Sequence, residues 1–345
     1  MQDQAISLEL QHEHLLKVSR TFALTIPLLP EDVADQVSNA YLLCRIADTV
    51  EDDPKAESSL KIAWLKEFAR LSFALFDDDL TLTALADRGY KLVAAGAKDT
   101  ELALMKDMVM VIKRTRTFPI AIRHILGRGV AILAAGMADS LNGVRIENLA
   151  DVDKYCYSVA GVVGELLAYI FAFKDQGIDK DKLLSLSVSF GEGLQLTNIL
   201  KDRLEDAARG VSFLPADAKT EDGVQHYVAI TKGHLDDARD FILSIPTRQS
   251  GIRKFCLLNI LMAEATVKLM HANPEGVLKI TRRAVKTLYM ACAFCACSNV
   301  LTRALYAFVG RGLRSERRDA ALLRKNISKW DRESVEILIE DQKDA

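Results

Sequence analysis

The chain has 345 residues, half of them hydrophobic and 27% charged, which is ample material for a large buried core. Its formal net charge of −2 gives no electrostatic reason to expect a nucleic acid as partner. The chain contains 7 prolines and 18 glycines, few for this length, and it is rich in alanine and leucine. This composition favours an all-α protein.

Helical periodicity runs along almost the whole chain. No long linker rich in glycine, serine or proline divides it, and no repeat recurs at a fixed period. We therefore expect one large helical domain over 1–345, with a core at about 15–310 and a charged, peripheral tail at 311–345. The expected helices span 32–50, 57–76, 99–114, 119–138, 151–173, 180–207, 222–243, 251–271 and 274–310.

The sequence predicts a cytoplasmic monomer without a transmembrane segment. Residues 1–13 are polar, which does not match a signal peptide. The most apolar stretch, 288–309, is interrupted by Ser298, Asn299 and Arg303, so it falls short of the ~20 apolar residues that a membrane span needs. A lipid substrate could still bring the protein into peripheral contact with a membrane.

The six cysteines have the pattern of reduced, buried residues rather than of a metal site. Cys292, Cys295 and Cys297 are close in sequence, but they lie in an apolar helical run with no histidine nearby. We interpret this cluster as core packing.

Two acidic clusters are the most informative feature of the chain. Asp48 and Asp52 lie four residues apart, and so do Asp202 and Asp206. On a helix this spacing places both carboxylates on one face, where they repel each other unless a cation lies between them. Hard oxygen ligands of this kind suit Mg²⁺, which binds a few carboxylates together with substrate phosphates.

Each acidic pair continues a polar stripe along its helix. Tyr41 and Arg45 share the face of the first pair, and Gln195 and Asn198 share that of the second. A solvated surface stripe is one interpretation. However, apolar residues flank the second stripe at 194, 196, 199 and 200, which favours a cavity filled by water or ligand.

A longer set of motifs surrounds these pairs in a fixed order. It comprises Ser-Arg-Thr-Phe at 19–22, Arg-Ile-Ala-Asp-Thr-Val-Glu-Asp at 45–52, Tyr-Cys-Tyr-Ser-Val-Ala-Gly-Val-Val-Gly at 155–164, Leu-Gln-Leu-Thr-Asn-Ile-Leu-Lys-Asp-Arg-Leu-Glu-Asp at 194–206, and Arg209-Gly210 to Pro215. This set, running from residue 19 to about 284, resembles the squalene and phytoene synthases. These are head-to-head prenyl synthases of the class I terpenoid synthase fold.

The resemblance implies an enzyme that condenses two farnesyl diphosphates in one central cavity. Mg²⁺ ions held by the two acidic pairs would bridge the diphosphates and neutralise the leaving group. The product of the first half-reaction would be presqualene diphosphate. In a squalene synthase NADPH then supplies a hydride, and the squalene would feed hopanoid or sterol synthesis.

The resemblance also assigns roles to residues. Tyr155 and Tyr41 would assist proton transfer or stabilise a cation, although Tyr41 could equally be a packed core residue. Lys201 departs from the arginine common in relatives; it keeps the charge but not the bidentate fork. The metal ligands would be Asp48, Asp52, Asp202 and Asp206. The diphosphate-binding residues would be Ser19, Arg20, Arg45, Gln195, Asn198, Lys201 and Arg209. The prenyl-chain pocket would contain Phe22, Val159, Ala160, Gly161, Gly164, Phe255 and Cys256.

Details of the motifs favour the reductive branch of the family. The segments at 155–161 and 195–199, and the Phe255-Cys256 pair, resemble squalene synthases. Phe255, Lys279 and Arg282 would bind NADPH, which has no glycine-rich dinucleotide fingerprint to receive it here. The alternatives are a non-reductive dehydrosqualene or phytoene synthase and a presqualene diphosphate synthase.

Proteins of other classes remain as alternatives. A non-catalytic helical scaffold would not depend on Asp48. A terpene cyclase would act on one diphosphate, which two acidic pairs and Ser19-Arg20 argue against. A di-iron bundle would need paired Glu-x-x-His motifs, whereas His226 and His234 lie in a polar stretch without them.

Overall fold

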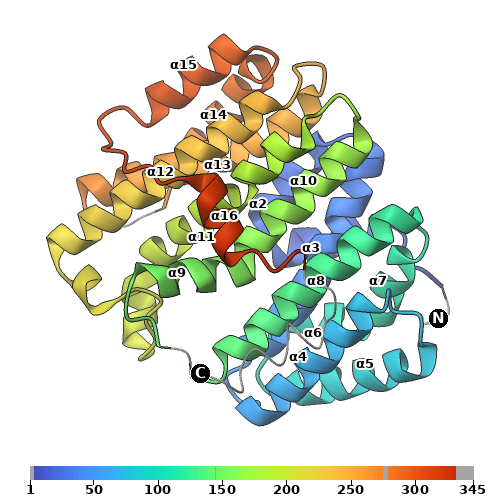
Figure 1. The fold of residues 1–345 in the computed structure, drawn as a ribbon. Helices are drawn as coiled ribbons and strands as arrows, with labels where there is room; N and C mark the ends of the chain where they lie inside the picture. Colours follow the sequence, from blue (N-terminus) through green and yellow to red (C-terminus); the bar gives the residue numbers. More distant parts are fainter. Residues whose placement is uncertain (1–3, 144, 275–278, 332–345) are drawn as a thin grey trace. The chain divides into compact units, whose positions relative to one another are not determined.

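The computed structural model describes residues 4–143, 145–274 and 279–331. These residues form helices and turns and contain no strand. Contacts divide the chain into two units, unit 1 (Met1–Val144 with Lys329–Ala345) and unit 2 (Arg145–Ser328). Each unit is an assembly of packed helices (Figure 1). The expectation of a single domain stays a prediction.

Unit 1 is built around α3, α4 and α8, and α8 packs against both of the others. Pro30 precedes α3 and Pro119 precedes α8, where a fixed φ suits the start of a helix. The helices of this unit are α1 (Leu8–Val18), α2 (Arg20–Thr25), η1 (Ile26–Leu28), α3 (Glu31–Glu51), α4 (Ser58–Phe73), α5 (Asp79–Val93), α6 (Asp99–Lys106), α7 (Met108–Thr115) and α8 (Ile120–Ser140).

Unit 2 is built around α11, which packs against α10, α12, α13 and α16 (Figure 1). The Asp179 carboxylate caps α11 by accepting from the Lys182 backbone N–H at 3.0 Å. The helices of this unit are α9 (Leu149–Cys156), the π-turn η2 (Tyr157–Gly161), α10 (Val162–Lys174), α11 (Lys180–Ala208), η3 (Ala216–Lys219), α12 (Glu221–Ser244), α13 (Ser250–Ala272), α14 (Arg282–Cys295), α15 (Asn299–Val309) and α16 (Ala320–Ile327).

Long-range contacts break two helices that the sequence predicts as continuous. The expected helix 99–114 divides at Asp107, whose carboxylate lies 2.8 Å from the imidazole of His14. Residues 275–278 of the expected helix 274–310 lie outside the described residues, and 279–281 are not helical. The rest divides into α14 and α15, and the carbonyl of Ala296 at the break accepts from the guanidinium of Arg253 at 2.6 Å. In each case a distant side chain binds at the break.

The expected helix 151–173 contains the π-turn η2 between α9 and α10. Glycines let this region approach α11 very closely. A Cβ at Gly164 would lie 1.9 Å from the carbonyl oxygen of Ser187, and one at Gly191 would lie 2.1 Å from that of Ala160. The close backbone contact therefore requires glycine at both positions.

The absence of a membrane-spanning segment, expected from the sequence, is contradicted. Three helices are long and apolar enough to cross a membrane, at Ile120–Ser140, Leu149–Lys174 and Ser250–Ala272. These helices carry a few polar residues, so none of them is the uninterrupted apolar run on which the sequence prediction relied. Two thirds of the most apolar window of each helix is buried inside the structure.

Residues 311–328 of the C-terminal tail belong to unit 2, and α16 within them packs there instead of lying at the periphery. Ala320 and Leu323 of α16 are buried, and α16 packs against α11. Arg318 pairs with Asp153 at 2.8 Å, and Arg324 pairs with Glu165 at 2.7 Å. These two arginines belong to the tail that was expected to be peripheral. They instead neutralise carboxylates of α9 and α10.

Candidate functional site

The first acidic pair lies at the C-terminal end of α3. Asp52 caps the helix through its backbone N–H, which donates to the carbonyl of Asp48 at 2.8 Å. The guanidinium of Arg45 lies 3.4 Å from the Asp48 carboxylate, and its other nitrogen donates to Glu101 at 2.5 Å. Sequence reasoning missed Glu101, whose local signal is only that of a helix N-terminus at α6.

The carboxylates of this cluster exceed the charge available to neutralise them. Desolvation raises the pKa of Asp48 to about 6; Arg45 opposes this shift and repulsion from Asp52 adds to it. Burial also raises the pKa of Glu51, and both aspartates contribute. A divalent cation bound here would relieve this repulsion, so these residues fit a magnesium site.

Ser19 and Phe22 lie beside Tyr41 in unit 1. The Ser19 hydroxyl caps α2 by accepting from the Phe22 N–H at 3.1 Å, and the Phe22 ring lies 5.0 Å from that of Tyr41. Burial raises the pKa of Tyr41, while a hydrogen bond with Ser19 and the charge of Arg45 oppose the shift. The structure thus brings the polar stripe of α3 together with the Ser-Arg-Thr-Phe motif, while Arg20 points to an exposed position.

The second acidic pair lies on the last turns of α11, and each carboxylate there has a cationic neighbour. The Lys201 ammonium lies 3.2 Å from Asp202 and 3.4 Å from the amide oxygen of Asn198. Asp206 is buried and forms an ion pair with Arg209, whose side chain is 71% exposed. An exposed arginine gains little from such a surface pair.

The remaining residue of this stripe, Gln195, is half-buried one turn below Asn198. The second cluster therefore supplies the oxygen donors that Mg²⁺ requires, together with two cations suited to phosphate. The two acidic pairs belong to different units: Asp48 and Asp52 lie in unit 1, and Asp202 and Asp206 lie in unit 2.

Tyr155 stacks on Phe213, with ring centroids 4.7 Å apart and an interplanar angle of 18°. Phe213 belongs to the segment after α11, which turns at Gly210 with a φ of 76°. Phe213 could not be predicted from its local sequence, because the pairing joins residues far apart in the chain. One face of the Tyr155 ring is therefore covered by this segment.

A cavity of about 720 Å³ opens beside the same segment. It is lined by Arg203, Leu204 and Ala207 of α11, by most of the segment between α11 and α12 but not Phe213, by Glu221 and Val224 at the start of α12, and by Asn273 and Pro274 just after α13. None of the predicted site residues lines it. On α11 its lining occupies a different face from that of Asp202 and Asp206.

The prenyl-pocket residues predicted in unit 2 divide into two groups, while Phe22 lies in unit 1. Val159, Ala160 and Gly161 lie in the π-turn η2, where Val159 and Ala160 are partly accessible and Gly161 is buried beside Gly164. Phe255 and Cys256 are fully buried in α13. Lys279 and Arg282, predicted to bind the cofactor, are exposed, unlike Phe255, and these assignments stay predictions.

Comparisons of the sequence with known proteins indicate one family. The sequence model described as squalene/phytoene synthase matches residues 15–289. The Botryococcus squalene synthase of Botryococcus braunii is 28% identical over 305 residues, which cover 80% of this chain and 61% of that protein. The squalene synthase of Eremothecium gossypii is 30% identical over 294 residues, covering 78% of this chain and 63% of that protein. The matches thus span little more than three fifths of these two relatives.

A solved structure of TcSQS in complex with the ligand E5700 has a TM-score of 0.74 against this chain, at 23% identity. The match covers 96% of this chain and 97% of that one. At this level of identity the likeness concerns the fold. The all-α fold class predicted from the sequence is confirmed.

Proposed function

The chain belongs to the squalene/phytoene synthase family, and we propose that it joins two farnesyl diphosphates head to head through presqualene diphosphate and reduces the product to squalene with NADPH. The observation that carries this proposal is the match over about four fifths of the chain to relatives named squalene synthase. The resemblance to this family noted from the motifs is confirmed.

Asp48, Asp52, Asp202 and Asp206 would hold magnesium. When bound, Mg²⁺ supplies positive charge that stabilises a departing diphosphate. The excess of carboxylates around Asp48 supports this role. Lys201 and Arg209 already lie beside the second pair and would contact phosphate oxygens; Arg209 offers a bidentate fork and Lys201 a point charge. Arg45, Ser19 and Arg20 would serve the first pair.

The two tyrosines have different chemical uses. The hydroxyl of Tyr41 carries its proton at neutral pH, as a tyrosine ordinarily does, and burial raises its pKa further, so it can donate to a phosphate oxygen. Tyr155, covered on one face by Phe213, can present its other face to a carbocation, which aromatic rings attract. Both residues would act by positioning and electrostatics.

NADPH would bind through two cationic side chains of unit 2. The exposed Lys279 and Arg282 offer positive charge for its phosphates, and the relatives' names support the reductive branch. Incubation with farnesyl diphosphate and Mg²⁺, with and without NADPH, tests this step. We expect squalene only with NADPH. Dehydrosqualene under both conditions, presqualene diphosphate as the end product, or reaction only with geranylgeranyl diphosphate would each refute the assignment.

The metal assignment has its own test. Asp48→Asn and Asp202→Asn should each lower turnover about 100-fold or more while leaving the far-ultraviolet circular dichroism unchanged, since only charge in the site is removed. Asp87→Asn, at an exposed position on α5, is the matched control and should keep full activity. Turnover retained in either site variant would contradict the ligand assignment.

A further inference from the structure

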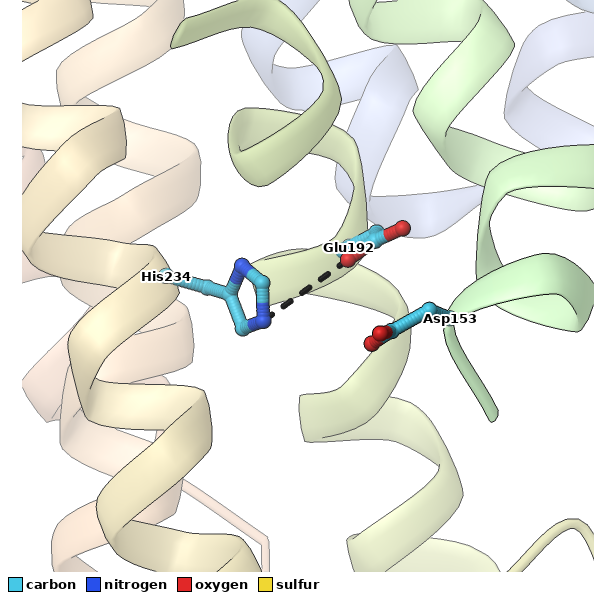
Figure 2. Close-up of side chains that lie close together, drawn as sticks. All are labelled: Asp153, Glu192 and His234. Carbon is cyan, nitrogen blue, oxygen red and sulfur yellow. Dashed lines mark ion pairs between the residues drawn. The ribbon is translucent and has the colours of Figure 1, made fainter. Parts of the chain in front are cut away.

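Three buried titratable side chains from three helices of unit 2 converge on one point. Asp153 of α9, Glu192 of α11 and His234 of α12 each direct one ligand atom there, and these atoms all lie within 4.8 Å of one another (Figure 2). Their residues are 6%, 0% and 3% exposed, respectively. No motif predicts this cluster, because its members are widely spaced in the chain and His234 lies in a polar stretch.

Two of these side chains lack the hydrogen bonds that buried polar groups normally make. Both carboxylate oxygens of Glu192 and both ring nitrogens of His234 have no hydrogen-bond partner among the residues that the structure describes. Burial raises the pKa of Glu192 and lowers that of His234 to about 3. Both groups are thus buried without gaining a hydrogen bond, which native structures rarely allow.

The spacing of these atoms suits a shared ion better than a hydrogen bond. Nε2 of His234 lies 3.7 Å from Oε2 of Glu192, beyond the ~2.7–3.2 Å of a hydrogen bond. Two ligands bound to one metal ion at about 2.1 Å each can be up to about 4.2 Å apart. If a protonated Glu192 donated a hydrogen bond to His234, the two atoms would lie closer than 3.7 Å. A direct Glu192–His234 hydrogen bond therefore does not explain this distance.

Asp153 is held by Arg318 from the C-terminal tail. The two guanidinium nitrogens bind its two oxygens, with Nη1 to Oδ1 at 2.8 Å. Each carboxylate oxygen has a further lone pair, so Asp153 can bind an ion and Arg318 together. Ligating carboxylates in metal sites are commonly oriented by such an outer hydrogen bond.

We propose that Asp153, Glu192 and His234 bind one divalent transition-metal ion, of the Zn²⁺ or Mn²⁺ kind, that joins α9, α11 and α12. One imidazole and two carboxylates suit such ions, whereas Mg²⁺ prefers oxygen ligands and retains its water. The ion is structural, since it lies within the packed helices of unit 2. This inference is independent of the proposed function.

The test uses the full chain, treated with a chelator and then supplied with one equivalent of Zn²⁺, Mn²⁺, Co²⁺ or Mg²⁺. Metal bound after gel filtration is counted by mass spectrometry, and the melting temperature is recorded. We expect about one transition ion per chain and a rise in melting temperature of several degrees. Co²⁺ should give a visible absorption band. Absence of the band and of a retained ion in the unaltered protein would overturn the proposal.

Variants locate the ion. Glu192→Gln and His234→Leu should lose both the ion and the rise in melting temperature. Asp48→Asn and Cys297→Ser, which alter the acidic pair of α3 and an exposed cysteine, should keep both. Retention of the ion by Glu192→Gln, or its loss from Asp48→Asn alone, would place it elsewhere. Glu192→Leu provides a second criterion: a melting temperature above that of the metal-loaded protein would mean that Glu192 is only an unpartnered charge.

Discussion

Replacing Arg253 with methionine should destabilise unit 2 severely, because this guanidinium binds the ends of several helices at once. Arg253 is fully buried. It donates to the carbonyls of Ile242 and Ile245 at 2.8 and 2.6 Å, where α12 ends, and to that of Ala296 at 2.6 Å, where α14 ends. It also reaches the side chains of Asn299 and Thr302 in α15.

The size of the effect follows from these acceptors. Carbonyls at the C-terminus of a helix lack their usual donor within the helix. All three would lose a charged partner; the Ile242 carbonyl would keep its bond from the Ile245 N–H at 3.1 Å, while those of Ile245 and Ala296 would be left buried without that donor. A buried group left without a partner costs about 1–3 kcal/mol, and hydrogen bonds to charged groups are worth about 1.5–3 kcal/mol each. Because such values do not add fully, we expect a loss of at least about 4 kcal/mol. For a unit of this size that corresponds to roughly 10 °C in melting temperature.

The assay is urea and thermal unfolding of the full chain, followed by circular dichroism. Arg248→Met is the matched control, because its side chain is 60% exposed and its ion pair with Asp175 lies at the surface. That control should change stability by less than about 1 kcal/mol. Arg253→Lys should fall between the two, since an ammonium can reach only some of the acceptors. A loss below about 1 kcal/mol for Arg253→Met would refute this reasoning.

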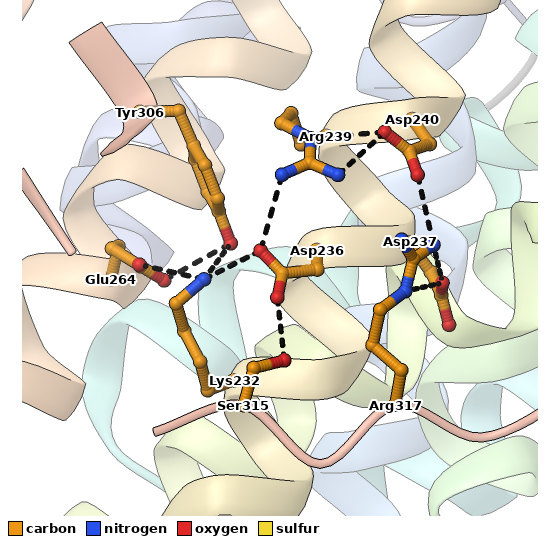
Figure 3. A network of polar contacts seen from close by, with 9 residues as sticks. All are labelled: Lys232, Asp236, Asp237, Arg239, Asp240, Glu264, Tyr306, Ser315 and Arg317. Carbon is orange, nitrogen blue, oxygen red and sulfur yellow. Dashed lines mark hydrogen bonds and ion pairs between the residues drawn. The ribbon is translucent and has the colours of Figure 1, made fainter. Parts of the chain in front are cut away.

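Three further predictions concern packing, pH and the covered tyrosine. Gly164→Ala should lower the melting temperature by several degrees, because its methyl group would lie 1.9 Å from the Ser187 carbonyl oxygen; an unchanged value would contradict the close approach. Burial raises the pKa of Glu264, in the network with Lys232, Asp236 and Tyr306 (Figure 3), to about 7. The native carboxyl then binds its proton more tightly than the unfolded one, so this group's contribution to unfolding free energy should fall as pH rises from about 4.5 to 7. The fall should be absent from Glu264→Gln in urea titrations across this range, and equal slopes in both proteins would disprove it. Phe213→Ala should lower the turnover of farnesyl diphosphate by exposing Tyr155, and Phe213→Tyr, which keeps the ring, should restore it.

The sequence predicts helices well where the signals are local. The expected helix 32–50 is one residue shorter at each end than α3 (Glu31–Glu51). The expected helix 180–207 begins where α11 (Lys180–Ala208) begins and ends one residue before it. A proline before the one and an aspartate cap before the other define their starts. By contrast, α5 was missed, although Asp78 caps it, because the acidic run there reads only as the end of the preceding helix.

Features that depend on distant partners could not be predicted from a single sequence. The break at Asp107 rests on His14, and that after α14 is bound by Arg253. The acidic pairs could be found because four-residue spacing is a local property. Glu101 and Phe213 could not, since each meets its partner only after the helices have packed.

The pairing of Arg318 with Asp153 and of Arg324 with Glu165 sets an order for folding during synthesis. The partners are 165 and 159 residues apart, so the carboxylates emerge from the ribosome long before their arginines. Until then α9 and α10 carry buried acids without these counter-charges, and their docking on α11 stays incomplete. A chain truncated after residue 317 should therefore be more readily digested by protease within 149–174 than the full chain.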